Sequence, residues 1–383
     1  MANKKSTPEF KQLRRSYGFD EVAIVPGDVT INPDQTNIEF KIEDNTFAIP
    51  ILAAAMDAVT DVKFAVIMNT LGGLAVLNLD GVQTRYEKPG ELLSKITQAS
   101  KTEITTLLQK VYTEPIKDNL VGERVKAIKN KRAICAVSVS PANAKRLAPL
   151  AAEAGADIIV IQATVTTTRH VSKSYRGLDF SELSKSIPKP IVVGNCVSYS
   201  ACLDLMRTGI SGVLVGVGPG AACTSREVLG VGVPQITATI DCAAAREAYL
   251  RESGRYVPII TDGGFRKSGD ICKAIVAGAD AVMLGSIMAQ TKEAPGLGYH
   301  WGMSQPNPAL PRGTRIKVGT TASLKQILFG PSSVTDGSQN LVGALRTAMG
   351  FCGAATIRDM HQVEMVIAPA ITTEGKSWQM AQQ

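Results

Sequence analysis

The chain has 383 residues, of which 45% are apolar and 5% aromatic, and it carries a formal net charge of +7. This length suits two or three average domains or one large α/β barrel. The modest basic charge suits an anionic small molecule such as a nucleotide, and no basic run with interleaved aromatic residues indicates nucleic-acid binding. No apolar run approaches the length of a membrane span, and the first residues lack an apolar signal region, so we expect a cytoplasmic protein.

Residue types that bind metal ions are few and scattered. The three histidines are far apart, and no two of the seven cysteines form a CxxC pair, which argues against a zinc site and a disulfide framework. The cysteines are Cys135, Cys196, Cys202, Cys223, Cys242, Cys272 and Cys352. The sequence therefore predicts free thiols, whose roles depend on the elements that carry them.

Eight short runs rich in β-branched residues recur along the chain and end in small residues. Because they show no period-two alternation, they are typical of parallel strands that are buried on both faces. Helical patterns at 141–155, 198–209 and 268–278 lie between such runs. The order predicts an α/β fold, a (β/α)8 TIM barrel, with a doubly wound open sheet as the alternative. The runs are IPILAAAM (49–56), GGLAVLNL (72–79), AICAVSV (133–139), DIIVIQA (157–163), PIVVGNC (190–196), GVLVGVG (212–218), PIITDGG (258–264) and AVMLGS (281–286).

Two connections are longer than a regular alternation of strands and helices requires. Residues 80–132, between the second and third runs, form a charged excursion with helical stretches. Residues 287–335, after the eighth run, are rich in proline and glycine, and a long loop of this kind is usually functional or disordered. We therefore expect one barrel domain over residues 1–383, with a helical insertion at 80–132 and an active-site loop within 287–335.

Glycine-rich and polar residues follow the carboxyl ends of the predicted strands, where barrel enzymes place their chemistry. The loops after the last two strands read DGG (262–264) and LGS (284–286), and their backbone N–H groups could bind a phosphate. The Asp262 carboxylate accepts hydrogen bonds only, which suits the diol of a ribose. Ordinary turn chemistry explains each feature alone, but their shared location predicts a nucleoside monophosphate site.

A cysteine lies within the loop GVGPGAACTSRE (216–227), just after the sixth strand. Glycine at this density indicates unusual backbone angles or a close approach to a ligand, although a plain turn with a buried cysteine is the alternative. A thiolate at the barrel mouth could add to an electrophilic carbon of a base. Cys223 is therefore the candidate nucleophile, and Cys196, at the end of the fifth strand, is its only competitor.

These residues resemble the IMP dehydrogenase/GMP reductase family from about Tyr17 to about Gln362. The segments that carry the resemblance are AAAMDAVT, VVGNCVS, GVGPGAACTSREVLGVGVPQ, TDGGFRKSGDICKAIVAGADAVMLGS, EAPG, WGM and GALRTAMGFCGAA. The resemblance implies a (β/α)8 barrel and a homotetramer. Most dehydrogenases of the family insert a pair of regulatory CBS modules after the second strand. Residues 80–132 are too few for that pair, so the chain resembles a short branch that lacks it.

The family chemistry implies a role for the loop cysteine. Cys223 would attack C2 of the purine; a dehydrogenase then passes a hydride to NAD and hydrolyses the intermediate, whereas a reductase displaces ammonia from GMP and takes a hydride from NADPH. Carbonyl groups of Gly218, Gly220 and Cys223 would ligate a monovalent cation, K+ in many members. The dinucleotide would lie against Gln162, Gly216, Val217 and Gly218. The residues implied to contact the nucleotide are Met56, Asn195, Asp262, Gly263, Gly264, Gly285, Ser286, His300, Trp301, Gly302, Met303 and Ser304.

Several positions depart from the family pattern. Ala54 and Ala221 replace serines, Ser225 replaces a threonine but keeps its hydroxyl, and Gln162 replaces an aspartate that holds the nicotinamide ribose. Only seven residues separate WGM from the proline of PRGTR, so the active-site loop is shortened and the family's mobile flap is largely missing.

The largest departure is Arg312. It replaces a glutamate or glutamine that contacts the base, and it is the third candidate catalytic residue beside Cys223 and Ser225. Arg312 or Arg315 could help to activate the hydrolytic water, although arginine is a poor base. That both arginines merely cover the loop is an equal alternative.

The sequence motifs MLGS and EAPG are typical of dehydrogenases of this family, whereas reductases have MLGG and ESGG at these positions. We therefore favour an NAD-dependent IMP dehydrogenase that converts IMP to XMP in guanine nucleotide synthesis. A GMP reductase is the alternative. A catalytically silent purine-nucleotide-binding regulator is a third hypothesis, but it would not need Cys223 beside Ser225.

Overall fold

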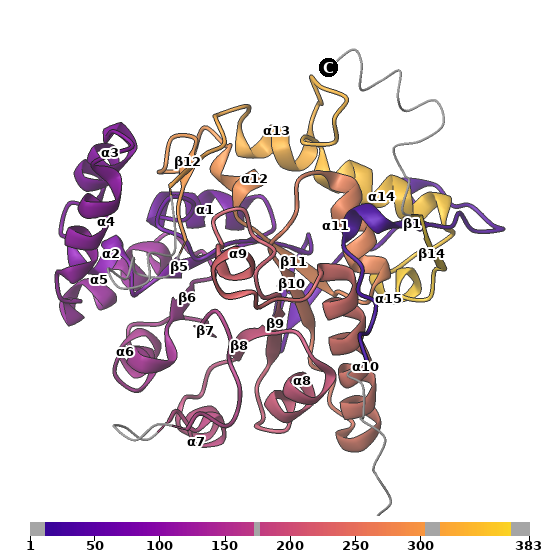
Figure 1. Ribbon diagram of the computed structural model, residues 1–383, viewed down its shortest axis with the longest axis horizontal. Helices are drawn as coiled ribbons and strands as arrows, with labels where there is room; N and C mark the ends of the chain where they lie inside the picture. Colours follow the sequence, from indigo (N-terminus) through magenta and orange to yellow (C-terminus); the bar gives the residue numbers. More distant parts are fainter. Residues whose placement is uncertain (1–11, 172–176, 303–314, 369–383) are drawn as a thin grey trace, which may run out of the picture.

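Eight parallel strands form a closed barrel in the structure, a computed structural model that describes residues 12–171, 177–302 and 315–368 (Figure 1). The strands lie in chain order around the barrel, and the last pairs with the first. Each predicted run contains one strand, which confirms the TIM barrel and rules out the open sheet. The strands are β4 (Ile51–Ala53), β5 (Leu74–Asn78), β6 (Ala136–Val139), β7 (Ile158–Gln162), β8 (Ile191–Cys196), β9 (Gly212–Val215), β10 (Ile259–Asp262) and β11 (Ala281–Leu284).

Helices surround the barrel and begin and end where the sequence supplies caps. Ser198 Oγ accepts a hydrogen bond from the Ala201 N–H at the start of α8, and Gly254 ends α10 with φ of 72°. The three predicted helical segments contain α6, α8 and α11. The helices of the outer layer are α1 (Val62–Thr70), α5 (Asp118–Lys129), α6 (Pro141–Glu153), α7 (Phe180–Ser186), α8 (Tyr199–Met206), α10 (Gln235–Ser253), α11 (Ser268–Val276) and α14 (Leu341–Phe351).

Apolar side chains fill the inside of the barrel, and a short hairpin closes its amino-terminal end. The hairpin strands β2 (Phe40–Ile42) and β3 (Asn45–Phe47) pair with each other. Their residues Phe40, Ile42 and Phe47 belong to the same buried cluster as barrel-interior residues such as Leu52 and Leu214. Because this end of the barrel is closed, ligands are expected to enter from the opposite end, where the strands finish.

The predicted helical insertion is present between β5 and β6. It contains α2 (Val82–Arg85), α3 (Pro89–Gln98) and α4 (Ile104–Thr113), which stand at one side of the barrel (Figure 1). These helices share a buried cluster that includes Leu93, Leu108 and Trp301. The insertion thus packs against the chain that follows the eighth barrel strand.

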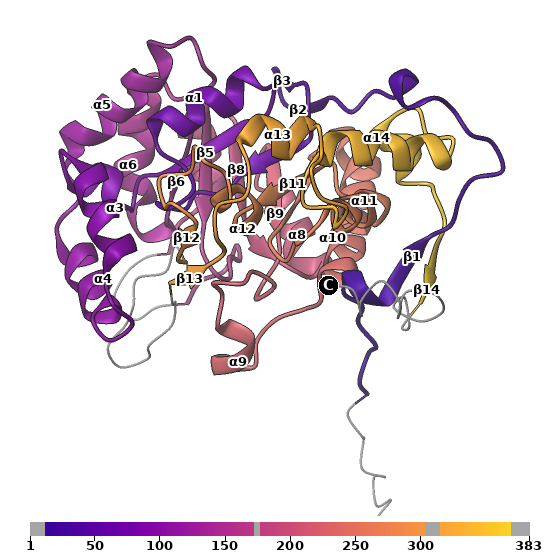
Figure 2. The same cartoon turned by 90° about the horizontal axis from the view of Figure 1, so that it is seen from above.

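Smaller elements complete the described chain, in which no helix has both the length and the apolar composition that a membrane span requires. The long loop after β11 is more regular than its composition suggests, because β12 and β13 pair antiparallel within it. Short α9 stands clear of the barrel in Figure 2. These elements are β1 (Val22–Ile24), β14 (Met365–Ile367), β12 (Tyr299–His300), β13 (Ile316–Lys317), α9 (Ser225–Leu229), α12 (Ser286–Ala289), α13 (Leu324–Phe329), α15 (Ile357–Met360) and the 3-10 helices η1 (Phe19–Glu21) and η2 (Pro33–Gln35).

Candidate active site

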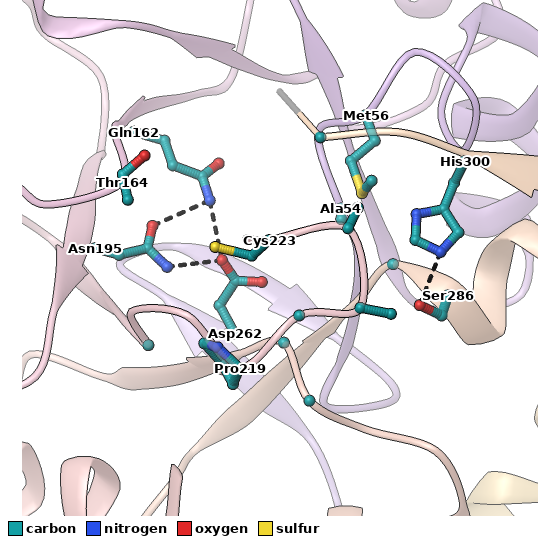
Figure 3. Close-up of a pocket in the computed structure, with 18 of the residues that line it drawn as sticks. Ala54, Met56, Gln162, Thr164, Asn195, Pro219, Cys223, Asp262, Ser286 and His300 are labelled. Carbon is teal, nitrogen blue, oxygen red and sulfur yellow. Dashed lines mark hydrogen bonds between the residues drawn. The ribbon is translucent and has the colours of Figure 1, made fainter. Parts of the chain in front are cut away.

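A cavity of about 950 Å³ lies at the carboxyl ends of the barrel strands. This volume is at the upper end of the range for small-molecule sites, so it suits two ligands side by side. Most of the predicted site residues meet here, although they come from segments far apart in the sequence (Figure 3). The predicted residues that line the cavity are Met56, Gln162, Asn195, Gly216, Gly218, Gly220, Cys223, Ser225, Asp262, Gly263, Gly264, Gly285, Ser286, His300 and Gly302.

Two predicted contact residues are not among the lining residues. Val217 and Trp301 are each only 2% exposed, because Val217 lies in the core and Trp301 lies in the cluster of the insertion. Three further predicted residues, Met303, Ser304 and Arg312, fall outside the residues that the structure describes.

Three polar side chains form a hydrogen-bonded group at one wall of the cavity (Figure 3). Asn195 Nδ2 and Gln162 Nε2 both donate to Asp262 Oδ2, at 2.8 and 3.0 Å, and Gln162 Nε2 also lies 3.1 Å from Asn195 Oδ1. Burial raises the pKa of Asp262 to about 6, against the hydrogen bonds from Asn195 and Gln162, which lower it. The group therefore holds an ionised carboxylate at neutral pH and leaves Oδ1 for a ligand hydroxyl.

The glycines of the loop after β9 permit backbone angles and contacts that a side chain would prevent. Gly216 has φ of 149°, and a Cβ there would lie 2.3 Å from the Asp262 carbonyl oxygen. Gly218 has φ of 83°, and a Cβ there would lie 2.6 Å from Arg226 Cγ. The loop can therefore cross closely above β10 and carry Cys223 over the barrel mouth.

Cys223 is a half-buried free thiol that lines the cavity. Its backbone N–H donates to the Gly220 carbonyl at 2.9 Å, which closes a turn, and its Sγ donates to Ser225 Oγ at 3.4 Å. The competitor Cys196 is 2% exposed and does not line the cavity. The structure thus distinguishes one accessible thiol from one buried thiol.

Hydrogen-bond donors from the loops after β10 and β11 also line the cavity. Within the described chain, the backbone N–H groups of Gly264, Gly285 and Ser286 have no intramolecular acceptor. His300 Nε2 lies 3.0 Å from Ser286 Oγ, and its buried Nδ1 has no partner among the described residues. Burial lowers the pKa of His300 to about 4, so its ring is neutral at pH 7. These groups can bind a phosphate through hydrogen bonds from neutral donors.

The sequence analysis missed a polar wing of the cavity beyond β5 and β6. Asn78, Asp80, Ser140 and Asn143 line this wing together with Thr164. Asp80 accepts hydrogen bonds from the Ser140 N–H and Oγ, at 2.7 and 2.8 Å, and from Asn143 Nδ2. The signal was present, because the segments NLD (78–80) and SVSPAN (138–143) also lie at the carboxyl ends of predicted strands, but neither contains the glycine or cysteine that marked the other strand ends.

The insertion is joined to the site by a chain of buried hydrogen bonds. Trp301 Nε1 donates to Tyr112 Oη at 2.7 Å, and Tyr112 Oη donates to Asp57 Oδ2 at 2.6 Å. Trp301 lies between His300 and Gly302, and Asp57 follows Met56. The three neighbours His300, Gly302 and Met56 line the cavity. Tyr112 of α4 therefore holds two loops of the site from behind.

Arg315 makes a second junction with the insertion. Its guanidinium donates to carbonyl oxygens at the end of α3, including Thr97 at 3.0 Å and Ala99 at 2.8 Å, and lies 4.6 Å from the centre of the Tyr299 ring. Arg315 is not a lining residue of the cavity, so the structure supports an anchoring role rather than activation of water.

We expect Tyr112→Phe to destabilise the protein by about 1–3 kcal/mol, because the buried Trp301 N–H loses its acceptor. The KM for the substrate should rise, since both supported loops line the site. Thermal unfolding and steady-state kinetics measure the two effects. Tyr86→Phe is the matched control, because Tyr86 Oη donates to the Val111 carbonyl at 3.0 Å in the same insertion without contacting Trp301. Equal effects of both substitutions would contradict this supporting role.

The fold and the site together define a class: a (β/α)8 barrel with an accessible thiol, a buried carboxylate and several backbone N–H donors around one cavity at the carboxyl ends of its strands. The family described as IMP dehydrogenase / GMP reductase domain matches residues 16–303. A protein of Mycolicibacterium smegmatis named uncharacterized oxidoreductase is 38% identical over 93% of this chain and 98% of its own. Inosine-5'-monophosphate dehydrogenase of Cryptosporidium parvum is 30% identical over 95% of this chain and 94% of its own.

A solved structure agrees with the sequence comparisons. The crystal structure of an IMP dehydrogenase/GMP reductase-like protein from Corynebacterium glutamicum matches with a TM-score of 0.89 and 34% identity, over 94% of this chain and 96% of that chain. The chain therefore belongs to the IMP dehydrogenase/GMP reductase family and is an oxidoreductase of that family, as its motifs predict.

Proposed function

We propose that the protein is an IMP dehydrogenase that oxidises IMP to XMP with NAD. The observation that carries the proposal is the position of Cys223, an accessible thiol in the same cavity as the Asp262 carboxylate and the N–H groups of Gly264, Gly285 and Ser286. These groups match the base, ribose and phosphate of one purine nucleotide. The dehydrogenase spellings MLGS and EAPG favour this direction of reaction over the reductase.

Cys223 would act as a covalent nucleophile. Its thiolate forms a bond from Sγ to C2 of the purine, and the hydrogen on C2 leaves with its bonding electrons as a hydride to the nicotinamide. Water then adds to C2, the C–S bond breaks with its electrons returning to sulfur, and XMP leaves. The balanced reaction converts IMP, NAD+ and water into XMP, NADH and a proton.

Asp262, Asn195 and Gln162 would position the nucleotide and its hydride acceptor. Asp262 accepts hydrogen bonds from the ribose hydroxyls, and the hydrogen bond from Asn195 holds this carboxylate at the wall of the site. Gln162 Oε1 is buried without a hydrogen-bond partner among the described residues, so it can accept a hydrogen bond from a hydroxyl of the dinucleotide. The polar wing at Asn78 and Asp80 leaves room beside the nucleotide for the nicotinamide half of NAD, which supplies the hydride acceptor.

The loop could also hold a monovalent cation such as K+. Its donors would be the backbone carbonyl oxygens of Gly218, Gly220 and Cys223, and oxygen donors suit such a hard cation. The Gly220 carbonyl accepts one hydrogen bond, from the Cys223 N–H, and keeps a second lone pair. These residues would then fix the loop that carries the nucleophile.

The remaining parts of the proposal depend on the family. We keep Arg312 as the candidate that activates water, with Ser225 beside the thiol at 3.4 Å. We propose a cytoplasmic homotetramer, without nucleic-acid or membrane partners.

Two parallel assays test the reaction. Purified protein is incubated with IMP plus NAD+, and separately with GMP plus NADPH, while the absorbance of the reduced cofactor is followed. We expect NADH to form with IMP and NADPH to persist with GMP. Consumption of NADPH in the GMP assay, with no NADH formed in the IMP assay, would indicate the reductase. No reaction in either assay, together with tight binding of IMP, would indicate the regulator.

Nucleotide binding should weaken as the pH falls through about 6. Asp262 is the cause, because its pKa is raised to about 6 and only the ionised form accepts two ribose hydroxyls. Asn195→Ala should move this transition to higher pH, since the hydrogen bond from Asn195 lowers the pKa of Asp262. Calorimetric titration with inosine, which has no phosphate of its own to titrate, measures both profiles. Identical profiles for the two proteins would contradict the assignment.

A further inference from the structure

Three buried cysteines meet outside the active site, on elements that are distant in the sequence. Cys196 ends β8, Cys202 lies on α8, and Cys242 lies on α10. Their sulfur atoms all lie within 4.8 Å of one another, and the residues are 2%, 0% and 0% exposed. None of the three lines the active-site cavity. The absence of CxxC spacing in the sequence therefore concealed a cluster that the fold assembles.

We propose that Cys196, Cys202 and Cys242 form a binding site for one thiophilic metal ion, of the class of Cu(I). A metal–sulfur bond of about 2.3 Å places three trigonal sulfurs about 4 Å apart, so the observed spacing requires only small side-chain movements. Sulfur-only ligands favour soft cations such as Cu(I) over hard cations such as Mg2+.

The surroundings of the cluster suit this occupant. The hydrogen bonds from the thiols to carbonyl groups are long, from Cys202 to the Cys242 carbonyl at 3.7 Å and from Cys242 to the Ser198 carbonyl at 4.0 Å. The three thiols also hydrogen-bond to one another, so a metal ion displaces weak interactions between thiols. Binding releases thiol protons to solvent and leaves negative charge on sulfur.

A bound ion would join the barrel wall to two outer helices. Cys196 directly follows Asn195, and along β8 the Asn195 side chain reaches the cavity, whereas Cys196 lies in the outer apolar layer. The ion would therefore lie behind the strand that supports Asp262, without contacting substrate. Because only the native fold brings the three sulfurs together, binding should raise the thermal midpoint.

Anaerobic titration with Cu(I), added as its acetonitrile complex against a competing chelator, tests the site. All proteins carry Cys223→Ala, which removes the accessible thiol of the active site. We expect one retained equivalent and a higher thermal midpoint in this background. Cys202→Ala should lose both, and Cys135→Ala, which removes a buried thiol elsewhere, should keep both. No retained ion in the background protein, or equal retention in all three proteins, would overturn the proposal.

X-ray absorption of the loaded background protein gives a test that does not depend on how the variants fold. We expect a first shell of three sulfur atoms. A shell dominated by nitrogen or oxygen, or one of two sulfurs, would overturn the proposed ligand set.

Discussion

Cys223→Ala should lower the turnover of IMP by about six orders of magnitude, the effect observed when the covalent nucleophile of a serine protease is removed. Without Sγ no bond to C2 can form, and a hydride cannot leave an unactivated ring at a useful rate. Nucleotide affinity should change little, because Asp262 and the phosphate-binding N–H groups remain. NADH formation measures the first effect, and calorimetric titration with IMP measures the second.

Cys352→Ala is the matched control for this substitution. Cys352 is also a half-buried free thiol, but its Sγ lies 3.8 Å from the Val25 carbonyl, at the β1 side of the molecule. This variant should keep the parent turnover. Substantial activity of Cys223→Ala, with Cys352→Ala unchanged, would remove the covalent mechanism.

Asp262→Asn should lower kcat/KM by about two to four orders of magnitude. The substitution preserves the shape of the side chain but removes its charge, and each lost hydrogen bond to a charged group costs about 1.5–3 kcal/mol. The two ribose hydroxyls lose their charged acceptor and one of its two oxygens, and the amides of Asn195 and Gln162 lose the carboxylate that orients them. Steady-state kinetics with IMP and NAD+ measures the effect.

Asp204→Asn controls for the change in net charge, because Asp204 lies on α8 with its side chain 54% exposed. It should behave like the parent protein. Thermal unfolding of Asp262→Asn should show a stability close to that of the parent, because the raised pKa of Asp262 means that its buried charge already costs stability. A kcat/KM within threefold of the parent would exclude Asp262 from the binding of the ribose.

The fold could be predicted because its signals are local. The buried strands of a parallel barrel are continuous apolar runs, and each predicted run, from 49–56 to 281–286, contains its strand. The barrel rule then places the ends of those strands at one opening. This rule was sufficient to bring Cys223 and Asp262, and through the family resemblance Asn195, into one cavity.

Features that depend on packing between distant segments could not be predicted. The ring of Trp301 turns away from the cavity because the insertion offers it an apolar cluster and Tyr112 Oη as an acceptor, and no local pattern specifies that choice. The cysteine cluster is similar, since Cys196 and Cys242 are 46 residues apart in the sequence and meet only when α10 packs beside α8. The position of Arg315 on the carbonyls of α3 likewise depends on the insertion.

The bond between Cys223 and the purine is the claim on which the proposed function depends, and trapping it is the most direct test. The protein is mixed with IMP and NAD+, quenched in acid during turnover, digested and analysed by mass spectrometry, with Cys223→Ala treated in parallel. We predict a nucleotide adduct on the peptide that contains Cys223 and none on any peptide of the variant. Continuous NADH formation without an adduct, or an adduct on another cysteine, would contradict the account.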